Sequence, residues 1–183
     1  MNPKFRADKT TQAASLLLKL RTEKMSYMKL VKLLYLADRE ALKRWGRPIS
    51  YDSYVSMDHG LVLSRTLNLI NASDRSEAQQ YWSKFISPPF GDHEIQSIKD
   101  PGTENLSESE EELLNEIFTE FGKMSRWEIV DYVHTLPEWI DPKGSAIPIQ
   151  YEDVLTGGGK TEAETASIKN EIEEIALAEL FLT

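Results

Sequence analysis

Apolar residues at helical spacing identify one stretch, Met25–Trp45, as the centre of the predicted fold. Two apolar rows run through it, so little of a helix there can face water. Ser26 can cap its start, whereas Gly46 and Pro48 end it. We place the basic residues of this stretch on the edge that remains exposed: Lys29, Lys32, Arg39, Lys43 and Arg44. The pattern therefore predicts a central core helix with one basic edge.

The same spacing predicts helices in most of the remaining chain. Four of them cover Asp8–Glu23, Asp52–Met57, Leu61–Asn71 and Ser76–Ile86. Three more begin at capping boxes, in which a Ser or Thr is followed three residues later by Glu; these are Ser107 with Glu110, Ser125 with Glu128, and Thr161 with Glu164. Short strands are predicted at Arg47–Tyr51, His93–Lys99 and Ala146–Gln150. The fold class is mainly α: a compact single-domain helical fold with at most a small two- or three-strand β element, plus a C-terminal helix.

Three consecutive glycines, Gly157–Gly159, indicate a hinge near the end of the chain. We therefore divide the chain into a helical domain, residues 1–156, and a Gly hinge with an acidic C-terminal helix, residues 157–183. At 183 residues one domain is the expected number.

Composition excludes several classes of protein. The chain has no cysteine, so it can form neither a disulfide framework nor a Cys-based zinc site. It has no secretory signal pattern at its start and no apolar run of about 20 residues, the length that spans a bilayer. We therefore expect a soluble, cytoplasmic protein without membrane contact.

The net charge of −9 is unevenly distributed. Residues 1–70 hold 13 Lys and Arg against 6 Asp and Glu, whereas residues 71–183 hold 8 against 24. A field divided in this way favours a macromolecular partner of complementary charge, although solvated helix faces without a partner are the alternative. The overall negative charge argues against strong nucleic-acid binding, because each phosphate contact needs a cation.

No catalytic or metal-binding motif is present, so no cofactor is expected. His59 follows Asp58 and could act as a general base, but a histidine that only stabilises a turn is the commoner case. Asp38 falls among apolar neighbours and needs a partner, for which Arg65 and the hydroxyls of Tyr51 and Tyr54 are candidates. A structural network explains Asp38 better than an acid–base role.

Aromatic residues gather around the end of the helix that begins at Ser125. Trp127, His134 and Trp139 lie there together with Glu138. Trp residues dominate binding hot spots, so this cluster could anchor a partner. Core packing is the commoner role of such aromatic residues and the favoured interpretation of this cluster.

The order of these motifs adds a resemblance to a known family. The run MKLVKLLYLADREALKRWGRPISYDSYVSMDHGLVLS resembles the signature of the Panacea domain, an antitoxin domain also called SocA-like. Its matching positions are Lys29, Leu30, Lys32, Leu33, Leu34, Tyr35, Gly46, Pro48, Tyr54, Gly60 and Val62. The run LSESEEELLNEIFTEFGKMSRWEIVDYVHTLPEW resembles the second half of the family, and the similarity extends over roughly Ser26–Leu155. One departure is Leu61, where the family usually has proline after the turn glycine.

The resemblance implies a non-enzymatic antitoxin of a type II toxin–antitoxin system, of bacterial or phage origin. Such a protein neutralises a co-encoded protein toxin by direct binding; the toxin would be a small alarmone-synthetase-like or translation-targeting enzyme. The alternatives left open are a proteolytic adaptor that delivers a toxin to an unfoldase-protease, a DNA-binding autoregulator, and a hydrolase that uses His59. A protease partner and an oligomer are also left open. The toxin-binding candidates are Tyr54, His59, Arg65, Trp127, Trp139, Glu171, Glu174 and Phe181.

Overall fold

A computed structural model of the chain describes residues 1–182, which form eight helices and five short strands. The helices are α1 (Ala7–Leu20), α2 (Tyr27–Trp45), α3 (Ser64–Ile70), α4 (Glu77–Phe85), α5 (Glu108–Phe121), α6 (Arg126–Val133), α7 (Tyr151–Gly157) and α8 (Glu162–Phe181). The strands are β1 (Lys24–Ser26), β2 (Tyr54–Met57), β3 (Gly60–Leu63), β4 (Glu94–Gln96) and β5 (Ile147–Ile149). The predicted class is confirmed: the fold is mainly α, with two small antiparallel sheets and a C-terminal helix.

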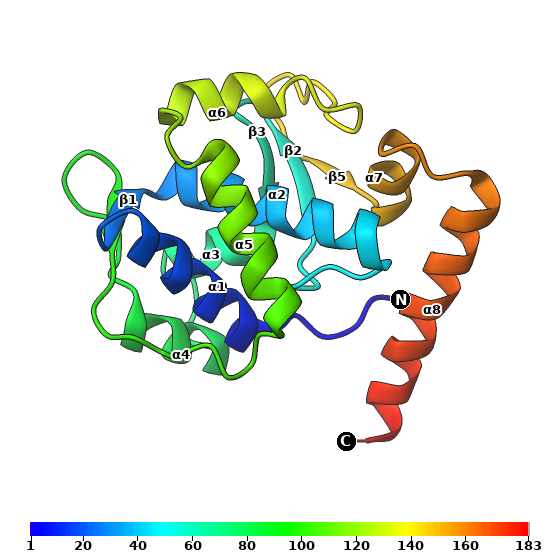
Figure 1. Ribbon diagram of the computed structural model, residues 1–183, viewed down its shortest axis with the longest axis horizontal. Helices are drawn as coiled ribbons and strands as arrows, with labels where there is room; N and C mark the ends of the chain where they lie inside the picture. The colour runs from blue at the N-terminus through cyan, green and yellow to red at the C-terminus, as the bar shows by residue number, and fades with distance from the viewer. Residues whose placement is uncertain (183) are drawn as a thin grey trace.

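The central helix α2 is the element on which the others pack. Helices α1, α5, α6 and α7 and strand β3 all contact it (Figure 1). Twelve of its 19 residues are buried. It ends at Gly46, whose φ of 71° is left-handed and whose amide donates to the carbonyl of Leu42. At its start, the Ser26 hydroxyl makes no capping hydrogen bond within residues 1–182, and the Tyr27 amide instead donates to the carbonyl of His93 (2.9 Å).

Two of the basic residues of α2 do not lie on an exposed edge, so that prediction is wrong for them. Lys29 is 5% exposed and Lys32 is 1% exposed. The Nζ of Lys29 donates to the carbonyl of Gly122, at the end of α5, where the helix dipole favours a cation. The Nζ of Lys32 donates to the carbonyl of Leu61 (2.9 Å). These bonds offset part of the cost of moving two ammonium groups out of water.

A β-hairpin replaces the predicted helix Asp52–Met57. Strands β2 and β3 pair antiparallel, with Tyr54 opposite Leu63 and Met57 opposite Gly60, and β5 adds to the other edge of β2. The side chains of β2 alternate between buried and half-buried, which is the period of a strand. A turn with a φ of 97° at Gly60 closes the hairpin, a conformation that glycine adopts without strain.

Asp52 lies just before the hairpin and caps the helix that follows it. Its carboxylate accepts the amides of Arg65 and Thr66 (2.8 Å each), so it caps α3 from the far side of the hairpin. Helix α3 consequently begins at Ser64, three residues after the predicted start at Leu61.

The predicted short strands have mixed outcomes. β4 lies within the predicted His93–Lys99, where it pairs with β1, and β5 lies within Ala146–Gln150. The predicted strand Arg47–Tyr51 is wrong, because two of its amides, those of Ile49 and Ser50, point to the side chain of Asp38 instead of to a strand. The three capping boxes are all formed, at the starts of α5, α6 and α8.

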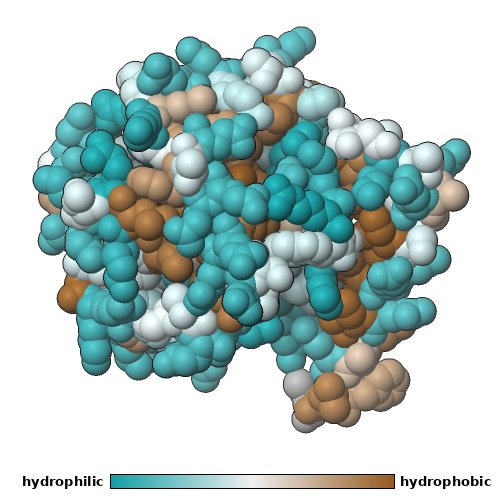
Figure 2. All heavy atoms as spheres, viewed as in Figure 1, coloured by the Kyte–Doolittle hydropathy of each residue, from teal (hydrophilic) through white to brown (hydrophobic). Residues whose placement is uncertain are grey.

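Helix α8 packs on the body of the molecule through its first four turns. Thr165, Ile172 and Ala176 are buried, and the side chain of Ile168 lies against Gly46. An ion pair of 2.6 Å joins Lys169 to Glu152 on α7. The N-terminal segment runs to the middle of α8 (Figure 1), while apolar residues gather at its last turn (Figure 2). Whether residues 157–183 act as a separate unit stays a prediction. No helix in residues 1–182 is long and apolar enough to cross a membrane.

Candidate binding site

The turn Asp58-His59-Gly60 between β2 and β3 is the feature around which the candidate site is built. Gly60 presses against α6 so closely that a Cβ there would lie 2.4 Å from the Cγ2 of Val133. Only glycine fits this contact and this φ at once. The side chains of Asp58 and His59 are thereby left exposed at the tip of the hairpin.

Two aromatic side chains from the segment after α6 hold this turn. The His134 ring is bonded through Nε2 to the carbonyl of Asp58 (2.9 Å), and the Trp139 indole donates to the carbonyl of Met57 (3.3 Å). These two rings also pack on each other, with centroids 4.5 Å apart. These contacts join the backbone carbonyls of the turn to side chains from the segment after α6, so the cluster fixes the turn on the body.

Trp127 completes this surface. Its ring meets His59 edge-on at 5.7 Å and is 51% exposed. The guanidinium of Arg126 lies over the same indole at 5.5 Å from the ring centroid. We call His59, Trp127, His134 and Trp139 the hairpin-tip surface. It combines a held backbone with one large exposed aromatic side chain.

A pocket of about 250 Å³ lies beside this surface. The exposed residues Asp58 and His59 form part of its mouth, and the buried Lys32 forms part of its wall. The other lining residues come from the start of α2, from the hairpin, from α3 and from the loop before β5: Tyr27, Met28, Val31, Met57, Val62, Leu67, Gly144 and Ser145. The Asp58 carboxylate accepts the Gly144 amide at 3.0 Å. Burial lowers the pKa of Lys32 to about 7. Sequence reasoning missed this lysine, because it assigned Lys32 to the exposed edge.

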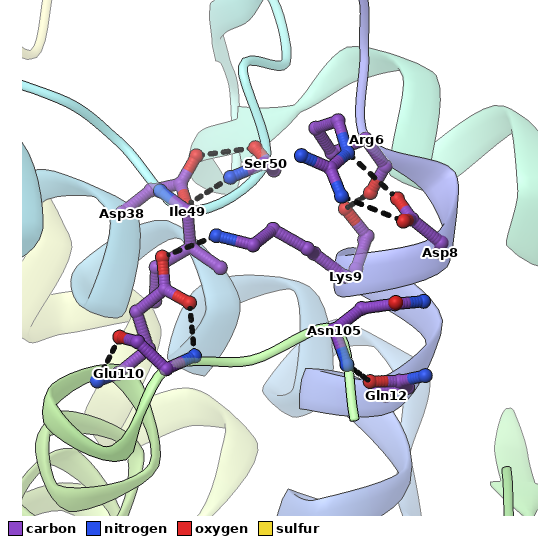
Figure 3. Close-up of polar contacts among 11 residues, drawn as sticks. Arg6, Asp8, Lys9, Gln12, Asp38, Ile49, Ser50, Asn105 and Glu110 are labelled. Atoms are coloured by element: carbon purple, nitrogen blue, oxygen red, sulfur yellow. Dashed lines mark hydrogen bonds and ion pairs between the residues drawn. The ribbon is translucent and has the colours of Figure 1, made fainter. Parts of the chain in front are cut away.

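Asp38 belongs to a separate, fully buried network. Its carboxylate accepts the amides of Ile49 and Ser50 (3.0 Å each, Figure 3) and the Ser50 hydroxyl. The Tyr54 hydroxyl donates to it at 3.3 Å, so one of the three partners considered from the sequence is found there. Burial raises the pKa of Asp38 to about 7, against the lowering effect of its Ser50 hydrogen bonds. The network ties the turn after α2 to β2.

A second buried group joins α2 to the segment after α6. The carboxylate of Glu138 accepts the Tyr35 hydroxyl (2.8 Å) and the guanidinium of Arg39 (2.5 Å to Nε). Glu138 therefore faces inward, away from the aromatic residues with which the sequence grouped it.

The structure brings together three of the eight predicted binding residues, His59, Trp127 and Trp139. Tyr54 is 1% exposed and belongs to the Asp38 network. Arg65 lies over the ring of Phe5, 5.9 Å from its centroid. The remaining three, Glu171, Glu174 and Phe181, are exposed on α8.

The structure also shows where the carboxylates nearest to a catalytic role lie. The carboxylate of Asp38 is engaged with Ile49, Ser50 and Tyr54, which leaves Asp58 as the candidate carboxylate for His59. In residues 1–182 no group of His, Asp or Glu side chains is arranged to hold a metal ion. An exposed tryptophan on a fixed surface is an arrangement that suits contact with another protein.

Comparison with known proteins identifies a family for this chain. Residues 30–140 match the family described as "Antitoxin SocA-like, Panacea domain". The match covers more than half of the chain, from α2 to the end of the hairpin-tip surface, and the chain belongs to this family. No curated protein and no solved structure matched it.

Proposed function

We propose that this chain is the antitoxin of a type II toxin–antitoxin system and neutralises a co-encoded protein toxin by binding it directly in the cytoplasm. The family match over residues 30–140 is the observation that carries the proposal. The site supports it, because its exposed groups suit contact with another protein and its buried carboxylates are held in internal networks.

The hairpin-tip surface is the contact that the geometry favours. Trp127 offers the largest exposed aromatic area there, and Trp is enriched among residues that dominate binding energy. Arg126 and His59 flank its indole, so the side chain is partly fixed before a partner arrives. Less side-chain entropy is then lost on binding.

The end of α8 is a second proposed contact. Phe181 is 88% exposed, and the carboxylates of Glu171 and Glu174 face solvent on the same helix. An apolar end with acidic flanks suits a basic partner surface, because the charges would speed approach while the apolar end is buried. Packing of α8 on the body limits this contact to its last turns.

Co-expression with the neighbouring gene tests the proposal. The gene next to this one should be toxic alone and tolerated with this chain, and the two products should co-purify. Trp127→Ser should weaken binding at least about tenfold, the size of a hot-spot loss. Trp45→Ser is the matched control, because Trp45 is also exposed (37%) but lies at the far end of α2.

Two results would contradict this assignment. A neighbouring product that is harmless, or toxic but unprotected by this chain, would remove the antitoxin role. Equal binding by Trp127→Ser and wild type would leave the antitoxin role intact but move the contact elsewhere.

A further inference from the structure

We propose that the pocket beside the β2–β3 turn binds a single carboxylate carried on a short apolar stem, with Lys32 as its counter-ion. This site goes beyond toxin neutralisation, and its first test needs no toxin. The evidence is the shape of the pocket, the position of the lysine and the charges around its mouth.

The pocket wall selects a small apolar stem. Met28, Val31, Val62 and Leu67 supply aliphatic surface from three different elements. The volume of about 250 Å³ is below the roughly 300–1,000 Å³ of sites for drug-sized ligands. The stem is therefore a short chain or a single ring.

The buried Lys32 is the reason to expect an anionic ligand in this pocket. Lys32 is 1% exposed, and its ammonium has three donors, of which one is used by the carbonyl of Leu61. The ion pairs formed within residues 1–182 do not include Lys32. A buried charge is costly to leave unpaired, and a carboxylate in the pocket would both pair it and accept its remaining hydrogen atoms.

The mouth of the pocket limits the ligand to one negative charge. Asp58 lies there with its carboxylate held by the Gly144 amide, and it would repel a second anionic group. The other titratable groups that face the pocket are Tyr27 and His59, and His134 lies behind the turn on the Asp58 carbonyl. A monocarboxylate whose stem passes the mouth meets the cation at the wall.

Methionine methyl signals give a direct test. Met28 and Met57 line the pocket, whereas Met25 and Met124 lie outside it and serve as internal references. The full chain labelled with ¹³C at methionine methyl groups is titrated with hexanoate and, separately, with hexanol, which has the same stem without the charge. Hexanoate should shift the Met28 and Met57 signals saturably and bind at least about tenfold more tightly than hexanol, as a charge-assisted hydrogen bond requires.

Lys32→Met removes the ammonium and keeps a side chain of similar length, so it should abolish the preference for hexanoate. Lys29→Met is the matched control, because Lys29 is a buried lysine one turn earlier on α2 that lines a different pocket. It should keep the preference. Equal binding of the two probes by the wild type, or an unchanged preference in Lys32→Met, overturns the proposal.

A pH titration of the wild type gives an independent measurement that needs no folded Lys32 variant. With the pKa of Lys32 at about 7, hexanoate should bind about tenfold more weakly at pH 8 than at pH 6, because the ammonium is lost. The same titration of His59→Gln and His134→Gln tests whether either histidine ring, and not the lysine, causes the pH dependence of hexanoate binding. An affinity independent of pH would contradict the role of Lys32.

A final competition experiment identifies the natural source of the carboxylate, and it rests on the proposed function. If the neighbouring gene product displaces hexanoate, the carboxylate comes from the toxin. If hexanoate and the toxin bind together, the source is a free acid. Failure of toxin binding would remove the antitoxin proposal but leave the hexanoate result unchanged.

Discussion

The carboxylate of Glu138 gives the sharpest stability prediction. Its side chain is 0% exposed and that of its partner Arg39 is 11% exposed. Glu138→Gln keeps the shape and an acceptor for the Tyr35 hydroxyl, but it leaves the guanidinium without a counter-ion. Breaking a buried ion pair in this way costs about 3–5 kcal/mol. Arg39 retains some contact with solvent, so we expect the lower end of this range, about 3 kcal/mol.

Urea unfolding followed by tryptophan fluorescence measures this loss of unfolding free energy, and thermal unfolding measures the fall in Tm that goes with it. In a chain of 183 residues each kcal/mol lowers Tm by about 2–4 °C, so the expected fall is about 9 °C. Replacing both partners by apolar side chains, Glu138→Leu with Arg39→Met, should recover much of the stability, because neither charge is then left buried alone.

Glu40→Gln is the matched control. Glu40 pairs with Lys43 and Arg44 on the same helix, and these side chains are 26–42% exposed. Exposed pairs contribute about 0–1 kcal/mol, so this variant should stay close to the wild type. If Glu138→Gln and Glu40→Gln lose the same small amount, the Glu138 pair does not hold the segment after α6.

Four further predictions concern the rest of the fold. Leu34→Ala should cost about 2–5 kcal/mol, because it opens a cavity at a residue that is 3% exposed; an unchanged Tm would contradict the central position of α2. In urea unfolding, Gly60→Ala should lower the unfolding free energy more than Gly91→Ala does, because a Cβ at Gly91 meets nothing within 4 Å. Equal losses of free energy would refute the close packing of the hairpin turn. Between pH 7 and 9 the unfolding free energy of the wild type should rise by about 2 kcal/mol relative to that of Lys32→Met. The reason is that Lys32 binds more protons in the unfolded chain, where its pKa is the ordinary 10.5, than in the folded chain, where its pKa is about 7. A difference between the two proteins that stays constant with pH would refute the lowered pKa. Deleting residues 160–183 should lower Tm and also weaken toxin binding, and an unaltered Tm would show that α8 does not pack on the body.

Most helices could be predicted from the sequence because their signals are local. The capping boxes at Ser107, Ser125 and Thr161 depend on residues three positions apart, and each is formed as predicted. The hairpin could not be predicted in this way. β2 has four residues, and its stability depends on β5, which lies about ninety positions later in the chain. Asp52 begins the predicted helix Asp52–Met57, but the helix whose amides it accepts begins beyond the hairpin.

Two lysines illustrate the same limit in the core. Sequence reasoning places lysine on a surface because a buried ammonium is costly. The acceptors that allow burial, the carbonyls of Gly122 and Leu61, come from distant segments. The available signal was that Lys29 and Lys32 fall inside the two leucine rows of α2, where an exposed edge has no room.

The candidate site was partly recognised for a related reason. The cluster of Trp127, His134, Glu138 and Trp139 is visible in the sequence, but its members point in different directions in the fold. Glu138 turns inward to α2, whereas the ring of the adjacent Trp139 holds the hairpin turn from outside. Only the tertiary contacts distinguish the buried Glu138 from the exposed Trp127 and from the half-buried His134 and Trp139.

Because Glu138 and Trp139 are adjacent in the chain, the stability of the core is linked to the shape of the binding surface. Glu138 fixes the segment after α6 on α2, and Trp139, the next residue, holds the carbonyl of Met57 at the hairpin. Loosening the first contact should therefore loosen the turn that carries His59. A surface held in place loses less entropy on binding. Glu138→Gln should for this reason weaken toxin binding even at temperatures where the variant is fully folded, and Glu40→Gln should not.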